Sequence, residues 1–290
     1  MLEKFRGTAA ALVTPFDQKG NIDFDALKRL LEHTSPHLDY YVVNGTTAES
    51  PSLSFEEQLS VLDFVKDFNK SAKPIVFGLG GNNTKEVIAK MQQMNVQGID
   101  AFLSVSPYYN KPTQEGMYQH FMALADASPL PLFLYNVPPR TGSNMSAKTT
   151  LRLAQHSNII AIKEAAGDLV QCTEIAKNKP NDFLLISGDD LITIPMISIG
   201  AVGVISVIAN GLPKIFCDSI NFALNGNYAK ANTLFHQYLE VNKLIFEEGN
   251  PAGVKSVLAS QNVIKDHVRL PLVSVSDDLK ERIKAEVEQI

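Results

Sequence analysis

The sequence of 290 residues contains no tryptophan and only two cysteines, Cys172 and Cys217. These two cysteines lie far apart, outside the short spacings typical of metal or redox motifs, and we expect both to be small buried side chains. Basic residues are not in excess either: 26 Lys and Arg stand against 31 Asp and Glu, a net charge of −5. This balance, without a basic cluster, argues against a nucleic-acid partner. The expected compartment is the cytoplasm.

The sequence also lacks an uninterrupted membrane-spanning segment. An uncharged run at 191–213 reaches the ~20 residues that cross a bilayer, but Pro195, Gly200 and Gly203 interrupt it. We expect a short helix, a turn and a buried strand there, since fully covered parallel strands are apolar throughout. The apolar stretch near the N-terminus ends at Pro15 and fits a strand better than a signal peptide. We therefore expect no membrane association.

What the sequence does have is a repeated alternation of strand-like and helix-like segments. With 45% hydrophobic and 20% charged residues, its composition is that of a globular protein. The predicted strands are 8–13, 40–45, 74–80, 101–107, 131–137, 159–165, 183–189 and 203–210. Strands that alternate with helices imply βαβ crossovers and a parallel sheet. Eight such units predict an α/β fold, a (β/α)8 TIM barrel, with an open doubly wound sheet as the alternative.

Helix start signals support this alternation. Ser54-Phe55-Glu56-Glu57 is a capping box, and further helix starts are predicted at Asp23, Thr84, Thr113 and Ser146. The pattern changes after Gly226, where three helices follow without clear strands, at 228–248, 251–261 and 277–290. We predict a barrel over 1–226 and a C-terminal helical extension over 227–290.

Period-two alternation selects candidate catalytic side chains at the strand ends, where barrel enzymes place them. In the sixth strand, Ala161 and Lys163 share one face, and bulky Ile160 and Ile162 share the other. Because helix-covered outer faces prefer bulky aliphatics, we expect Lys163 to point inward. The same reasoning places Tyr135 inward on the neighbouring strand.

A lysine buried without an ion partner is costly unless it is neutral. A neutral amine attacks a ketone to form an imine, which then serves as an electron sink. Lys163 is therefore a candidate for Schiff-base chemistry, with an ordinary ion pair as the alternative; the adjacent Glu164 faces the other way and is a poor partner. Tyr135 could move protons at the imine, although a core tyrosine is the simpler interpretation.

Two further groups could hold carboxylates. The backbone N–H groups of Thr46 and Thr47 follow a glycine in a turn, and Arg140 follows a rigid Pro-Pro pair at the barrel mouth. Simple turn chemistry and a surface arginine are the alternatives. No dinucleotide fingerprint, P-loop lysine or clustered metal ligands are present, so the sequence predicts no cofactor.

Together these segments resemble the dihydrodipicolinate synthase and N-acetylneuraminate lyase superfamily of Schiff-base aldolases, over nearly the whole chain. The motifs are GTTAES at 45–50, YNVPPRTG at 135–142, IKEAAGD at 162–168 and SGDD at 187–190. The Thr46-Thr47 pair and Arg140 favour the synthase branch, a lyase that condenses pyruvate with aspartate semialdehyde in the diaminopimelate route to lysine. Ala48 departs from the glycine common at that position.

The resemblance implies a role for each matching residue. Lys163 would form the imine with pyruvate, and Tyr135, Thr46 and Tyr109 would relay protons. Thr47, with Thr46, would bind the pyruvate carboxylate, Arg140 would position the semialdehyde, and Gly188 and Ile205 would shape the pocket. Tyr109 would come from a neighbouring subunit, which implies a homotetramer, a dimer of tight dimers.

The resemblance also suggests an effector site for lysine, formed by Ser50, Asn82, Glu86 and Tyr108. Phe55 and Gln58 stand where inhibited relatives often have histidines, so inhibition is a hypothesis. Two other functions remain open at this point. One is a sibling aldolase acting on a 2-keto-3-deoxy sugar acid or N-acetylneuraminate, against which Arg140 and Thr47 count. The other is a non-catalytic binding barrel.

Overall fold

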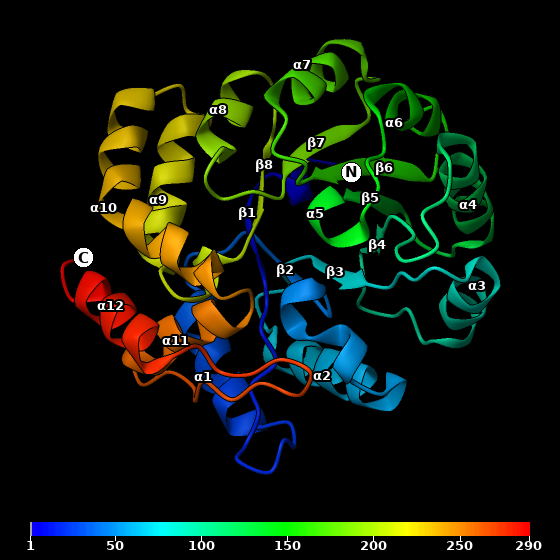
Figure 1. Cartoon of the computed structure of the whole chain (residues 1–290). Helices are drawn as coiled ribbons and strands as arrows, with labels where there is room; N and C mark the ends of the chain where they lie inside the picture. The colour runs from blue at the N-terminus through cyan, green and yellow to red at the C-terminus, as the bar shows by residue number, and fades with distance from the viewer. Residues whose placement is uncertain (1) are drawn as a thin grey trace. The chain divides into compact units, whose positions relative to one another are not determined.

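The computed structural model describes residues 2–290. Eight parallel strands form a closed barrel in the order β1 to β8 (Figure 1). The strands are β1 (Gly7–Ala11), β2 (Tyr40–Val43), β3 (Ile75–Gly78), β4 (Ala101–Val105), β5 (Leu132–Asn136), β6 (Ile159–Glu164), β7 (Leu184–Ser187) and β8 (Gly203–Ser206). The predicted barrel is confirmed, and the open-sheet alternative is wrong.

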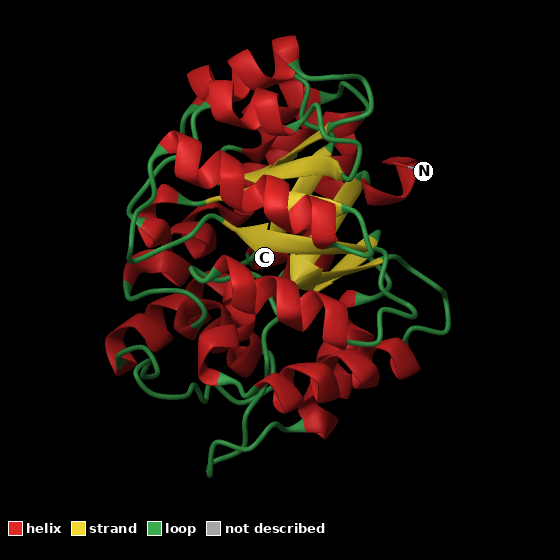
Figure 2. Cartoon of the chain, turned by 90° about the vertical axis from the view of Figure 1, so that its right-hand side faces the viewer, coloured by secondary structure: helices red, strands yellow, loops and turns green. Residues whose placement is uncertain are grey.

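Helices separate these strands and continue beyond the last of them; they are drawn in red, and the strands in yellow, in Figure 2. The α-helices are α1 (Phe24–Thr34), α2 (Phe55–Phe68), α3 (Thr84–Gln93), α4 (Gln114–Ala127), α5 (Pro138–Thr141), α6 (Ala147–Leu153), α7 (Leu169–Asn178), α8 (Thr193–Ser198), α9 (Pro213–Leu224), α10 (Tyr228–Glu247), α11 (Ala252–Ser260) and α12 (Asp277–Val287). Short 3-10 helices are η1 (Leu2–Phe5), η2 (Thr46–Ala48), η3 (Ser50–Ser52) and η4 (Ile208–Asn210). The predicted C-terminal helices are thus present.

The helices begin where their capping residues indicate. The Ser54 side chain accepts from the Glu57 N–H, and the Glu57 carboxylate accepts from the Ser54 N–H, which completes the predicted capping box of α2. Asp23, Thr113 and Ser146 cap the helices predicted to start there. The cap of α3 is Asn83, one residue before the predicted start, because its amide oxygen accepts from the Glu86 N–H.

The chain divides into two compact units. The first consists of Pro74–Ile205 with the N-terminal residues up to Arg6, and the second of Gly7–Lys73 with Ser206–Ile290. The domain boundary predicted at Gly226 lies inside the second unit, between α9 and α10, and stays a prediction. None of the helices within residues 2–290 combines the length and apolar character that a membrane crossing requires.

The buried residues of each unit are predominantly apolar, as the sequence pattern predicted. In the first unit, Phe5 packs edge-on against Phe133 of β5, with ring centroids 5.0 Å apart. Cys172 and Cys217 are both buried free thiols, and burial raises the pKa of each to about 12. Their predicted role as small core side chains is confirmed, since thiols with such pKa values are inert.

Candidate active site

Lys163 and Tyr135 are paired residues on neighbouring strands of the first unit. Their Cα atoms are register partners in the β5–β6 ladder, so their side chains share one face of the sheet. The Lys163 side-chain nitrogen lies 4.4 Å from the centroid of the Tyr135 ring. Both residues are buried, and Lys163 is only 5% exposed. Their predicted placement on one face is confirmed; their roles stay predictions.

Glu164, the next residue along β6, belongs to a different set of contacts. Its carboxylate accepts hydrogen bonds from the side-chain amides of Asn136 and Gln171 and from the backbone N–H of Ala166. Burial raises the pKa of Glu164 to about 7, although these hydrogen bonds oppose the shift. The Glu164 side chain therefore lies on the face of β6 opposite to Lys163. Within residues 2–290, no ion pair joins these two residues.

Gly188 follows β7 and lies directly against the Lys163 side chain. A Cβ atom at this position would lie 2.8 Å from the Cε of Lys163 and 2.8 Å from the Cβ of Ala165. Only glycine permits this approach without a shift of its neighbours. The Gly188 N–H donates to the Glu164 carbonyl at 2.8 Å, which joins the loop after β7 to the last residue of β6. Ile205 is fully buried in β8.

Tyr109 lies in the loop between β4 and α4 and has an unusual backbone conformation. Its φ angle is +70°, and the Asn110 N–H donates to the Tyr108 carbonyl at 2.8 Å, so Tyr109 is the central residue of a strained γ-turn. Its side chain is 89% exposed. A strained residue that presents an aromatic ring to solvent is a candidate for function rather than for packing.

The other predicted residues of this unit lie at loop and helix ends. Arg140 is exposed in α5, directly after β5. Among the predicted effector residues, the Asn82 amide donates to the Tyr108 carbonyl at 3.1 Å, so these two are brought together. Glu86 pairs with Lys90 along α3, and this lysine lowers the pKa of the Glu86 carboxyl.

In the second unit, Thr46 and Thr47 begin the 3-10 helix η2 after Gly45. The first N–H groups of a helix have no partner within it, so these two donors are available to a ligand. The Thr47 hydroxyl accepts from the Asn250 amide at 3.1 Å in a buried contact. The predicted effector residue Ser50 starts η3, and its carbonyl accepts from the Gln58 amide at 2.9 Å.

One buried ion pair in this unit was not predicted from the sequence. Lys255 of α11 donates to Glu49 at 2.6 Å, and both side chains are 0% exposed. The two residues are 206 positions apart, so no local spacing joins them. The signal that could have found it was Lys255 itself, a lone charge in the otherwise uncharged segment at 252–260, because buried lysines require partners.

The barrel, the buried lysine and the adjacent tyrosine are the features of an aldolase-type lyase, and comparison with known proteins identifies the family. The Dihydrodipicolinate synthetase family model matches residues 4–290. The chain belongs to this family.

Its relatives agree with this assignment along their full length. A 4-hydroxy-tetrahydrodipicolinate synthase from Cytophaga hutchinsonii is 49% identical over 284 residues, which cover 98% of this chain and 96% of the relative. A dihydrodipicolinate synthase from Acinetobacter baumannii, chloride inhibited and complexed with pyruvate, is 36% identical with a TM-score of 0.94, covering 98% of each chain. A monomeric dihydrodipicolinate synthase variant is 32% identical with a TM-score of 0.95, covering 99% of this chain and 97% of that one. The chain is thus an enzyme of the 4-hydroxy-tetrahydrodipicolinate synthase class.

Proposed function

We propose that the enzyme joins pyruvate to L-aspartate 4-semialdehyde through a Schiff base on Lys163, in the route to diaminopimelate and lysine. The observation that carries this proposal is the buried Lys163 nitrogen beside the Tyr135 ring, 4.4 Å from its centroid, without a carboxylate partner among residues 2–290. The pyruvate complex of the Acinetobacter baumannii relative supports the first substrate.

The reaction balances without an added oxidant, reductant or cofactor. The Lys163 amine attacks the keto carbon of pyruvate and water leaves, which gives the imine. The methyl carbon then loses a proton to form an enamine, and this carbon attacks the aldehyde of the second substrate. Finally, the amino group of the semialdehyde attacks the imine carbon, closes the ring and releases Lys163.

Proton movement in these steps is assigned to three hydroxyl groups. Tyr135 is adjacent to the imine nitrogen, and Thr46 and Tyr109 complete the relay. The exposure of Tyr109, 89% in one chain, supports its use in the site of a neighbouring subunit. We therefore propose a homo-oligomer, a dimer of tight dimers. The monomeric variant among the similar structures supports an oligomeric origin for that protein.

The carboxylates of the two substrates require separate binding groups. The N–H groups of Thr46 and Thr47, at the start of η2, suit the pyruvate carboxylate. The planar guanidinium of Arg140 suits a two-pronged contact with the carboxylate of the semialdehyde. Gly188 and Ile205 shape the pocket, in which Gly188 leaves room for the lysine side chain.

Lysine inhibition is a second proposal for the same enzyme. Asn82 and Tyr108 are joined by a hydrogen bond, and with Ser50 and Glu86 they would bind the amino and carboxylate groups of the effector. Saturating lysine is expected to lower the initial rate. An unchanged rate rejects the effector site without bearing on catalysis.

We also propose that the enzyme is located in the cytoplasm. The two buried free thiols support a reducing compartment of this kind.

The decisive experiment traps the imine. The enzyme is incubated with pyruvate, reduced with borohydride and analysed by mass spectrometry of its peptides. We expect a three-carbon adduct on Lys163 and none in Lys163→Ala, which should remain folded. Absence of the adduct in the unmodified enzyme rejects the mechanism. Rates with aspartate semialdehyde and with sugar acids then separate the synthase from a sibling aldolase.

A further inference from the structure

Glu49 directly follows the pyruvate-binding turn and has a left-handed backbone, with φ 57° and ψ 35°. Its N–H donates to the Thr46 carbonyl at 3.1 Å, which closes η2. This conformation is unfavourable for a residue with a side chain. Such strain persists only where the surroundings determine it, so the contacts of the Glu49 side chain decide the shape of the turn.

Both oxygens of the buried Glu49 carboxylate are engaged. Oε1 accepts from the Lys255 ammonium at 2.6 Å, and Oε2 accepts from the Arg269 backbone N–H at 2.9 Å. Lys255 also donates to the His267 carbonyl at 2.8 Å and lies over the Phe16 ring, 4.3 Å from its centroid. The ammonium is thus held in place by protein groups on several sides.

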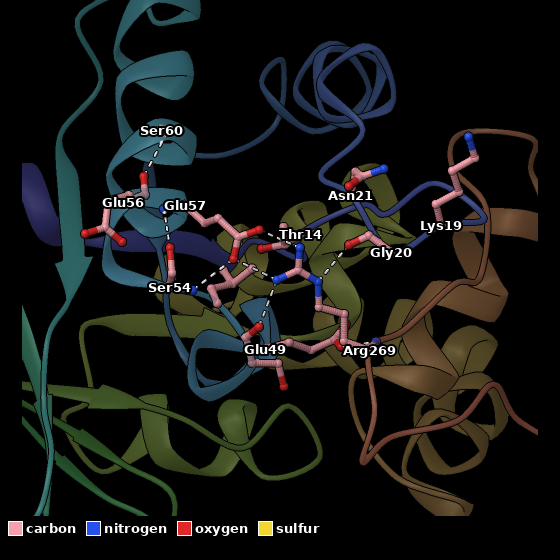
Figure 3. A network of polar contacts seen from close by, with 12 residues as sticks. Thr14, Lys19, Gly20, Asn21, Glu49, Ser54, Glu56, Glu57, Ser60 and Arg269 are labelled. Carbon is pink, nitrogen blue, oxygen red and sulfur yellow. Dashed lines mark hydrogen bonds and ion pairs between the residues drawn. The ribbon is translucent and has the colours of Figure 1, made fainter.

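Arg269 is itself anchored, as Figure 3 shows. Its guanidinium donates to both oxygens of Glu57 at 2.7 and 2.6 Å. It also donates to the Ser52 and Gly20 carbonyls, each at 2.8 Å. This fixes the backbone N–H that contacts Glu49, and it connects the turn to Glu57 of the α2 capping box.

The two residues that follow Thr46 in the turn, Thr47 and Ala48, are also held by hydrogen bonds. Asn250 holds the Thr47 hydroxyl at 3.1 Å, and Thr14 donates to the Ala48 carbonyl at 2.8 Å. The Thr46 hydroxyl has no hydrogen-bond partner among residues 2–290. The arrangement fixes the backbone and leaves the Thr46 hydroxyl for a substrate.

We propose that Glu49 and Lys255 are positioning residues that aim the Thr46 and Thr47 N–H groups at the carboxylate of the keto acid, and so set the affinity for pyruvate. This inference rests on the function proposed above. Burying two charges costs about as much free energy as their attraction returns. The pair is therefore better explained by the conformation that it imposes on the strained turn than by a gain in stability.

The test compares a charge-free double variant, Glu49→Gln/Lys255→Met, with the unmodified enzyme. Replacing both partners leaves no unpaired buried charge. We expect the pyruvate concentration for half-maximal borohydride trapping, and KM for pyruvate, to rise about tenfold, a loss of ground-state binding. The expected kcat at saturating pyruvate stays within about threefold. If Glu49 and Lys255 only stabilised the fold, KM for pyruvate would be unchanged in the folded fraction of the variant.

Two further variants complete the test. Tyr238→Phe removes a buried hydrogen bond to Ser219 in the same unit and controls for lost stability; its pyruvate KM should not change. Glu49→Gln alone keeps the volume and decides the question if the double variant does not fold. Normal half-saturation in the folded Glu49 variant overturns this inference alone. Absence of trapping in the unmodified enzyme overturns the proposed function, and this inference with it.

Discussion

Gly188 and Lys163 are in such close contact that a methyl group on the glycine would lie 2.8 Å from the Cε of the lysine. Real side-chain carbons do not approach so closely, so Gly188→Ala forces its neighbours to move, and we expect the flexible Lys163 side chain to be displaced. We expect borohydride trapping of pyruvate to slow by about tenfold or more, because small misplacements of a reacting group are costly. Overpacking should also lower the free energy of unfolding by about 1–3 kcal/mol.

A second variant separates the two neighbours of Gly188. Ala165→Gly/Gly188→Ala removes the contact with the Ala165 methyl and keeps the contact with Lys163. Trapping should remain slow in this variant. Recovery of the unmodified rate would show that Ala165, and not the displaced lysine, causes the defect.

Tyr109 and Lys163 should complement each other across subunits. Tyr109→Phe and Lys163→Ala are each expected to be nearly inactive. In the proposed tight dimer, a mixed dimer of the two variants has one of its two sites with both residues intact, so the purified mixed dimer is expected to have about half of the unmodified activity. Purification through two different tags and assay of the mixed species measures this recovery. Activity no greater than that of the separate variants contradicts a shared site.

Glu164 should make stability depend on pH between about 4.5 and 7. Burial raises its pKa to about 7, so the folded chain binds a proton that the unfolded chain has released. This contribution is fully present below the unfolded pKa and is lost as the pH rises through 7, a total of about 3 kcal/mol. Denaturant unfolding at several pH values should show this loss in the unmodified chain and not in Glu164→Gln.

The exposed acid Glu115 provides a control, because its pKa is shifted in the opposite direction to that of Glu164. Hydrogen bonds from Gln119 and Arg152 lower the pKa of its carboxyl, so Glu115→Gln should not remove the loss of stability between pH 4.5 and 7. Equal pH profiles for Glu164→Gln and the unmodified chain would show that folding does not raise the pKa of Glu164.

Lys255 should make pyruvate affinity fall above about pH 8. Burial lowers its pKa to about 8, while Glu49 and Asp266 favour the charged form and Arg269 opposes it. Above that pH the ammonium loses its charge, and Glu49 loses its ion partner. KM for pyruvate should rise there in the unmodified enzyme. In the charge-free double variant, KM for pyruvate should not rise in this pH range. A rise in both enzymes would assign the pH dependence to another titrating group.

The strands could be predicted because buried parallel strands are apolar runs bounded by turns, and all eight were located. Their ends were less accurate. The segment predicted at 40–45 ends at Val43, because Asn44 adopts a φ of 60° and leaves the sheet. The segment predicted at 203–210 ends at Ser206, because η4 begins at Ile208. Such changes depend on contacts that are distant in the sequence.

The candidate site could likewise be predicted only in part. Period-two alternation was sufficient to place Lys163 beside Tyr135, because strand register converts it directly into spatial proximity. The contacts that support the turn at Thr46–Ala48 could not be predicted. Glu49 and Lys255 are brought together by tertiary packing across 206 positions, and neither shows a local motif.

The γ-turn at Tyr109 has a consequence for engineering this enzyme. A glycine would relieve its left-handed backbone and remove an exposed aromatic ring, so thermal selection on isolated chains would favour Tyr109→Gly. If the ring serves a neighbouring subunit, that selection would discard a residue whose value is visible only in the assembly. Screens of this fold should therefore score turnover together with melting temperature, since a residue can be a burden to its own chain and necessary to another.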